Sequence, residues 1–182
     1  MTKPPLNGIA LLGAPGTGKT SVGWELATII GADRLTFSEA LKQELSRMLA
    51  YSEPGSVQHY YQEMTNPATK DAYRPLQQAL GAFRRAQDED YWVQQALAAM
   101  RPGRAYVSDD CRYWNEYHAL KNLGFVFIRL LPGPTTRPLT GAQAEHESER
   151  DWPHFPVDAK VEFIEGPDRM ANHIATVLRL VD

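Results

Sequence analysis

The sequence predicts an α/β fold with a parallel sheet of about five strands, and three observations lead to this prediction. Apolar runs of strand length alternate with segments whose apolar residues recur at helical spacing, which is typical of a parallel sheet with crossover helices. The first apolar run, 8–12, leads through a glycine-rich turn straight into such a helical segment. The run at 125–131 is almost continuously apolar, as in a central strand that is buried on both faces.

The glycine-rich turn at 13–20 has the pattern G-x-x-x-x-G-K-[ST]. The apolar stripe from Val22 to Ile30 after it predicts a helix that ends at Gly31. The turn therefore joins a strand end to a helix start, where backbone N–H groups and the positive end of the helix dipole converge on a bound phosphate. In such a loop Lys19 reaches the β- and γ-phosphates and the Thr20 hydroxyl ligates Mg²⁺. The ATP-binding residues expected here are Gly13, Ala14, Pro15, Gly16, Thr17, Gly18, Lys19, Thr20 and Ser21.

The later elements follow from the same patterns. We expect strands at 34–37, 105–108, 125–131 and 159–164, the last of them an edge strand because its polar and apolar residues alternate. Helices are expected from Ser38, which would act as a cap, then near 56–65, 68–86, 90–100 and 113–122, and finally from Pro167. Residues 132–156 have no clear period and predict a loop or mobile flap.

The segment between the second and third expected strands is the second informative feature. It spans about 65 residues and looks almost wholly helical, whereas one crossover helix needs far fewer. Arg74, Arg84 and Arg85 lie in it, and one or two of them are candidates for binding the phosphate of an acceptor molecule. The alternative is a solvated basic face.

Composition limits the classes of function. The net charge of −3 argues against a protein that coats nucleic acid. The single cysteine, Cys111, allows no disulfide within the chain, and the five histidines show no zinc-ligand spacing. No apolar stretch approaches the ~18 residues of a membrane span. We therefore expect a soluble cytoplasmic protein that binds neither polymeric nucleic acid nor a membrane.

Charged residues that follow strand ends should line one crevice with the loop, because ligands of such sheets bind at the carboxyl ends of the strands. Asp109 and Asp110 follow the third expected strand, and Asp110 is the preferred Mg²⁺ ligand beside Thr20. Arg112 is a candidate phosphate clamp that Glu116 would orient, and the alternative is an ion pair one helical turn apart.

The flap and the second strand end add further candidates. Arg137 or Arg150 could act as a charge-stabilising finger over the transferred phosphoryl group, with mobile surface charge as the alternative. Phe37 and Ser38 follow the second expected strand and join the candidate acceptor site.

Four pieces, in order, resemble the phage-type deoxynucleoside monophosphate kinases of the P-loop kinase superfamily. They are the loop at 13–20, the run 73–81, the D-x-R-[FY]-x-N-E run at 110–116, and His146-x-Ser148-Glu149, which matches an H-x-S-E motif. The resemblance implies a single three-layer domain of strand order 2-3-1-4-5, with its core at 6–37, 104–131 and 157–182. It also implies a helical acceptor-binding insertion at about 38–103, a short lid at about 132–156 and host cytoplasm if the gene is phage-borne.

By the same resemblance the protein transfers the γ-phosphoryl group of ATP to a deoxynucleoside monophosphate, with Mg²⁺ as cofactor. The resemblance makes Asp110 and Arg112 acceptor- or metal-site residues, and it makes His146 and Glu149, with Ser148 between them, lid residues. Together with the candidates argued above, the expected catalytic residues are Lys19, Arg112, Arg137 and Arg150. The expected acceptor residues are Phe37, Ser38, Arg74, Arg84, Arg85, Asp110, Arg112 and Glu116.

Two alternatives stay open. One is a kinase for another small molecule, such as a sugar acid or a nucleoside, for which Asp109 could be the base. The other is a nucleotide-gated regulatory ATPase, although the N-K-x-D motif that reads guanine is missing. The oligomeric state is also open, with a homodimer as one alternative.

Overall fold

A computed structural model describes residues 7–134, 136 and 149–179. The chain divides into two compact units. The first is formed by the residues up to Thr36 and those from Met100 onward, and the second by Phe37–Ala99. Each unit is described by itself below.

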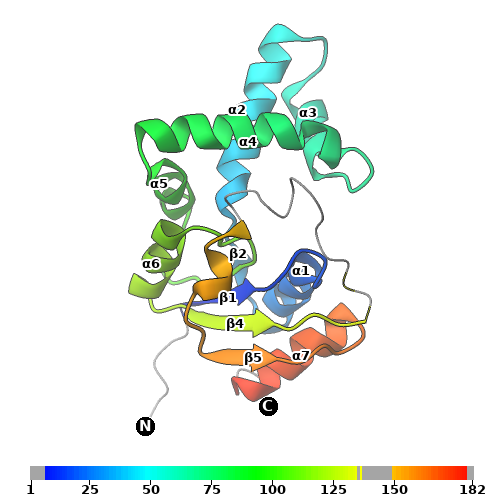
Figure 1. Cartoon of the computed structure of the whole chain (residues 1–182), viewed down its shortest axis with the longest axis vertical. Coiled ribbons are helices and arrows are strands. Elements are labelled where there is room, and N and C mark those ends of the chain that lie inside the picture. Colours follow the sequence, from blue (N-terminus) through cyan, green and yellow to red (C-terminus); the bar gives the residue numbers. More distant parts are fainter. Residues whose placement is uncertain (1–6, 135, 137–148, 180–182) are drawn as a thin grey trace. The chain divides into compact units, whose positions relative to one another are not determined.

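The first unit is built on a five-stranded parallel sheet with the order β2-β3-β1-β4-β5 (Figure 1). The strands are β1 (Gly8–Leu12), β2 (Asp33–Arg34), β3 (Tyr106–Ser108), β4 (Val126–Leu130) and β5 (Ala159–Val161). In the central register, Ile9 of β1 stands opposite Val107 of β3 and Val126 of β4. The predicted fold class and strand order are both confirmed.

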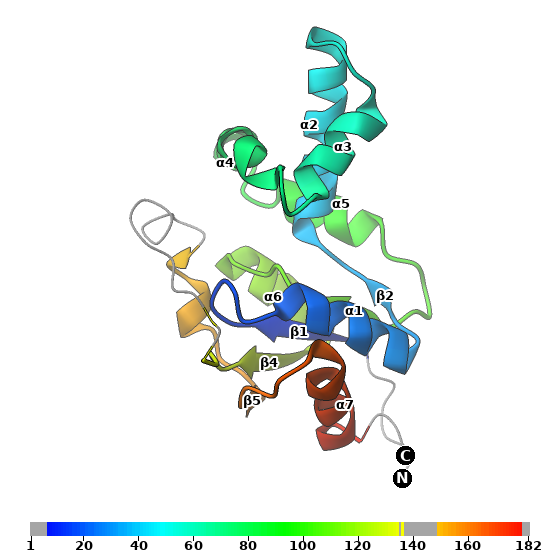
Figure 2. The ribbon, with the colours of Figure 1, turned by 90° about the vertical axis from the view of Figure 1, so that its right-hand side faces the viewer.

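Helices cover both faces of this sheet, which gives three layers. Helices α1 (Lys19–Ile30) and α7 (Pro167–Val177) pack side by side (Figures 1 and 2), and their apolar residues join Ile9 and Leu11 of β1 in one buried cluster. Helix α6 (Trp114–Asn122) serves the other face, where the ring of Tyr117 lies 4.4 Å from that of Phe127. Successive residues of a strand point to opposite faces of the sheet, so each strand contributes side chains to the packing on both faces.

The four strands expected after the first are all shorter in the structure, and β2 and β5 each end three residues early. Strand β2 ends at Arg34, and although the Leu35 N–H still bonds to the Val107 carbonyl, helix α2 begins at Phe37. Ser38 therefore lies inside the first turn and does not precede the helix. Strand β5 ends at Val161 and pairs only with β4 among the described residues, so its predicted edge position is confirmed.

The second unit is wholly helical, as predicted for the insertion. It contains α2 (Phe37–Ser52), α3 (Val57–Thr65), α4 (Lys70–Gln87) and α5 (Tyr91–Ala98). Helix α2 packs on the other three, and the shared core consists of Leu41, Leu45, Tyr60, Met64, Leu80 and Trp92. Met48 of α2 lies outside this core and is 51% exposed. No helix in the described part of the chain is long and apolar enough to cross a membrane.

Candidate functional site

The loop at 13–18 runs from the end of β1 to the start of α1, where the motif predicts it. Gly16 and Gly18 have φ values of 81° and 80°, in the left-handed region that glycine adopts without strain, and Gly18 is the N-cap of α1. The loop is closed internally, since the backbone N–H and the hydroxyl of Thr17 donate to the Ala14 carbonyl at 3.2 and 2.8 Å. Thr17 itself is buried. Such a loop presents backbone N–H groups at a helix N-terminus, which is the chemistry of an anion site.

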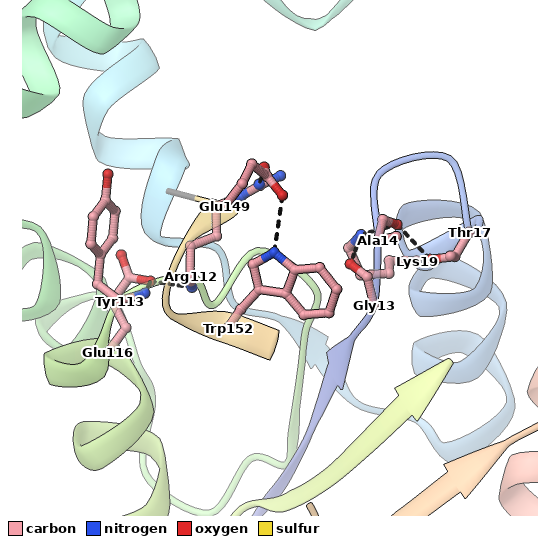
Figure 3. Close-up of polar contacts among 9 residues, drawn as sticks. All are labelled: Gly13, Ala14, Thr17, Lys19, Arg112, Tyr113, Glu116, Glu149 and Trp152. Carbon is pink, nitrogen blue, oxygen red and sulfur yellow. Dashed lines mark hydrogen bonds and ion pairs between the residues drawn. The ribbon is translucent and has the colours of Figure 1, made fainter. Parts of the chain in front are cut away.

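The ammonium group of Lys19 lies over this loop (Figure 3). It donates to the carbonyl oxygens of Gly13 at 2.7 Å and Ala14 at 2.9 Å. Burial, and then the nearby charge of Arg112, lower the pKa of Lys19 to about 8, while Glu149 and Asp109 act in the opposite direction. A buried cation of this kind gains from an incoming phosphate, whose negative charge compensates for the hydration that burial removes.

The residues expected to hold Mg²⁺ have suitable oxygen donors. Thr20 is exposed in the first turn of α1, and Asp110 follows Asp109 after the carboxyl end of β3. A hydroxyl and a carboxylate are hard oxygen ligands, and Mg²⁺ keeps several waters and phosphate oxygens besides one or two protein ligands. This donor set therefore fits Mg²⁺ bound together with a nucleotide.

Asp109 has a buried ion-pair partner that the sequence did not reveal. Its carboxylate pairs with the guanidinium of Arg34 at the end of β2, and both side chains are largely buried. The guanidinium also lies 5.0 Å from the ring centre of Trp24 and donates to the Thr20 carbonyl at 3.3 Å. The ion pair engages one of the two carboxylate oxygens, Oδ1.

Arg112 is held by Glu149, a residue of the expected lid (Figure 3). Nη1 of Arg112 forms an ion pair with one carboxylate oxygen of Glu149. The indole N–H of Trp152 donates to the other oxygen at 2.9 Å. Trp152 lies in a 3₁₀ turn, Trp152–His154, and was not among the expected site residues.

Glu116 orients Arg112 by a different route from the one expected. Its carboxylate accepts the backbone N–H groups of Arg112 at 2.7 Å and Tyr113 at 3.1 Å, as part of the capping box of α6. Burial raises the pKa of Glu116 to about 8, against the effect of these hydrogen bonds. Glu116 therefore fixes the backbone at Arg112, and the guanidinium pairs with Glu149 instead.

Two of the three candidate arginines of the helical unit, Arg84 and Arg74, form ion pairs with carboxylates of that unit. Arg84 of α4 pairs with Glu44 of α2 at 2.5 Å, and the Tyr91 hydroxyl donates to the same carboxylate at 3.0 Å. Arg74 pairs with Asp71 at 2.8 Å on an exposed face. The guanidinium of Arg85 lies beside Gly81 on the same helix.

Of the remaining expected residues, the structure describes Phe37, Ser38 and Arg150. Phe37 is buried and Ser38 half-buried at the start of α2. Arg150 is exposed and its Nε donates to Asp151 at 3.2 Å. Arg137, His146 and Ser148 lie outside the described residues.

Comparisons with known proteins show similarity to solved structures alone. No protein-family model matches the chain, and no curated protein matches it significantly. Among solved structures, a shikimate kinase from Aquifex aeolicus is similar with a TM-score of 0.50 and 13% identity, over 94% of this chain and 96% of that one. A shikimate kinase from Acinetobacter baumannii in complex with shikimate gives 0.49 and 15%, over 96% and 93%. A gluconokinase from Sinorhizobium meliloti gives 0.43 and 18%, over 95% of each chain.

Of these three, the first reaches a TM-score of 0.50, and at 13% identity it shows a shared fold rather than a shared activity. The chain thus has the fold of a P-loop kinase, with the glycine-rich loop at 13–18 in its expected place between β1 and α1.

Proposed function

We propose that the protein is an ATP- and Mg²⁺-dependent kinase that phosphorylates a deoxynucleoside monophosphate to the diphosphate. The observation that carries the proposal is the cationic pair of Lys19 and Arg112 in one unit, the first over the phosphate loop and the second near enough to lower its pKa. Two cations that repel one another in this way gain from an anion bound beside them. The acceptor class rests on the resemblance of the runs at 110–116 and 146–149.

The residues present suit phosphoryl transfer, in which the protein mainly positions and neutralises two polyanions. The loop and Lys19 would hold the donor phosphates, and Thr20 and Asp110 would hold Mg²⁺. That ion supplies charge neutralisation between the β- and γ-phosphates when it is bound. Arg112 would take an oxygen of the transferred group or of the acceptor phosphate, because a guanidinium fork matches phosphate geometry.

The state of Asp109 favours a phosphate acceptor over an alcohol. A phosphate acceptor is already ionised near neutral pH and needs no base, whereas an alcohol needs a carboxylate or similar group to take its proton. The carboxylate at the end of β3 that could do this, Asp109, is buried in its pair with Arg34. A kinase that needs no base is therefore the better match to this arrangement.

An ADP-release assay tests the proposal. We expect turnover with at least one of dAMP, dGMP, dCMP and dTMP, and a loss of about a hundredfold or more in Lys19→Ala, since a preorganised cation contributes on this scale. Lys121→Ala is the matched control, because this exposed lysine of α6 contacts Tyr117 and lies outside the loop.

Three results would contradict parts of the proposal. Turnover with a sugar acid or nucleoside and with no dNMP would change the acceptor to an alcohol. ATP hydrolysis that no small acceptor stimulates would indicate a nucleotide-gated protein. Full activity in Lys19→Ala would overturn the assignment of the loop.

A further inference from the structure

A continuous series of contacts runs from strand β4 to Arg112, and it involves two residues to which the proposed reaction assigns no role. We propose that Trp152 and Arg129 are positioning residues that set the guanidinium of Arg112 through Glu149. The contacts themselves do not depend on what the protein does, although the role of Arg112 rests on the proposed function.

The first link is Arg129, near the carboxyl end of β4. Its Nη2 donates to the carbonyl oxygens of Phe155 at 2.8 Å and Trp152 at 3.4 Å. In the sheet it stands opposite Leu12, the residue before the phosphate loop. The 3₁₀ turn that carries Trp152 is thus tied to the strand beside the loop.

Arg129 is a costly residue for the interior of a sheet. Its Nε is buried and has no hydrogen-bond partner within the described part of the chain, and no described carboxylate forms an ion pair with it. Burying an unpaired polar group is unfavourable, so an apolar residue here would pack at lower cost. The hydrogen bonds by which Arg129 attaches the segment 152–155 to β4 offset this cost.

The second link joins Trp152 to Glu149. The indole N–H donates to one oxygen of the Glu149 carboxylate, and the other oxygen pairs with Arg112. Figure 3 shows the contact of the carboxylate with the indole, and the guanidinium of Arg112 at the same carboxylate. With both oxygens engaged, Glu149 cannot turn about its terminal bond without losing a charge-assisted contact. The indole N–H therefore decides where Glu149 holds Arg112.

The third link leads from Arg112 to the reacting groups. Its pair with Glu149 uses Nη1, and a guanidinium has five N–H donors in a fixed fork, so donors remain for a phosphate oxygen. Arg112 is near enough to Lys19 for its charge to lower the pKa of the lysine. A change in the direction of the guanidinium would thus change the electrostatic potential at a phosphate bound by Lys19.

The experiment is a double-mutant cycle between Trp152→Phe and Arg112→Ala. Phenylalanine keeps an aromatic ring and removes the N–H together with part of the volume of the indole. We expect Trp152→Phe to lower kcat/KM about tenfold, as for the loss of one hydrogen bond to a charged group. In the Arg112→Ala background the same substitution should change kcat/KM by less than about twofold, because coupled residues are not additive. Arg129→Lys should also lower kcat/KM, and this effect should disappear in the Arg112→Ala background.

Trp92→Phe is the matched control, since the buried Trp92 also donates its indole N–H, to the Gly81 carbonyl at 3.3 Å, but in the helical unit. It should cost stability and leave the affinity for ATP, measured by calorimetry, unchanged. A merely structural role for Trp152 would lower kcat/KM equally with and without Arg112, and this result would overturn the inference.

ATP affinity separates failure of this inference from failure of the proposed function. If the wild type turns over no acceptor, the proposed function fails and the cycle is evaluated on the dissociation constant for ATP. A Trp152 effect that disappears without Arg112 then still supports the positioning role. A Trp152→Phe protein with wild-type values in every measurable quantity overturns it.

Discussion

The lowered pKa of Lys19 leads to a quantitative prediction for ATP binding. Its ordinary value of 10.5 falls to about 8 in the folded protein, mainly because the side chain is buried and then because Arg112 is near. In the proposed function, ATP binding at the loop requires the charged ammonium, so the affinity for ATP should fall once Lys19 loses its proton. For one proton with a pKa of about 8, the dissociation constant at pH 9 should be about tenfold higher than at pH 7. With the ordinary pKa it would be almost unchanged.

Calorimetric titration of ATP between pH 7 and 9.5 measures this dependence. Arg112→Ala should move the midpoint upward, because it removes a positive charge that disfavours the ammonium, and Glu149→Gln should move it downward. Lys19→Arg should bind with a flat profile, since a guanidinium stays charged. Glu116 also has a pKa of about 8, and Glu116→Gln should leave the midpoint in place. A dissociation constant that does not change up to pH 9.5 would refute the reasoning.

The same shift predicts an opposite trend in stability. Below about pH 8 the lysine is charged in both the folded and unfolded states, and the difference from 10.5 corresponds to about 3 kcal/mol against the folded state. The unfolded chain binds more protons between pH 8 and 10.5, so this contribution to the free energy of unfolding rises with pH there. Lys19→Met should be more stable than the wild type at pH 7, by denaturant unfolding, and this advantage should shrink toward pH 10.

Three further predictions concern the framework. Gly13→Ala should destabilise the loop by about 1–3 kcal/mol and weaken ATP binding, because a Cβ there would lie 2.8 Å from the Leu130 carbonyl oxygen; thermal unfolding and calorimetry measure both effects. Asp33→Asn should lower stability to urea at pH 7 and have little effect near pH 2. Two arginines lower the pKa of this carboxyl to about 2, so its contribution to stability is lost as the pH falls through that value. Equal losses of stability at both pH values would refute this. Ser56→Ala should cost about 1 kcal/mol of unfolding free energy, since its hydroxyl accepts the His59 N–H at the start of α3; a change within error of zero would refute this.

The fold was largely predictable because its signals are local. The loop motif, the stripe that follows it and Gly31 set one strand and one helix within a single stretch of sequence. Strand β2 was overestimated because Leu35, Thr36 and Phe37 have strand-like side chains, while burial of Phe37 at the start of α2 decides the local structure. Tertiary packing overrides propensity at such short edge elements.

The site was predictable only where one segment carries it. The loop residues lie together in the sequence, so their spacing revealed them. The pair of Arg34 and Asp109 joins positions 75 residues apart, and that of Arg112 and Glu149 joins positions 37 apart. No periodicity connects such residues, and the indole of Trp152 gave no chemical signal of its own. An arginine such as Arg129 inside an otherwise apolar strand is the one visible anomaly that could have drawn attention to this region.

The ion pairs of Asp33 with two arginines have a consequence for exchanging the helical segment of this fold. Its carboxylate binds Arg101 at 2.6 Å and Arg104 at 2.9 Å. The chain leaves the sheet unit a few residues after Asp33 and returns just before Arg101, so the point of departure and the point of return are fastened together. The helical segment is thus a cassette with adjoining ends. Chimeras that exchange residues 37–99 for the corresponding segment of another protein of this fold should keep a folded sheet unit, and under the proposed function such an exchange would change the acceptor without rebuilding the loop at 13–18.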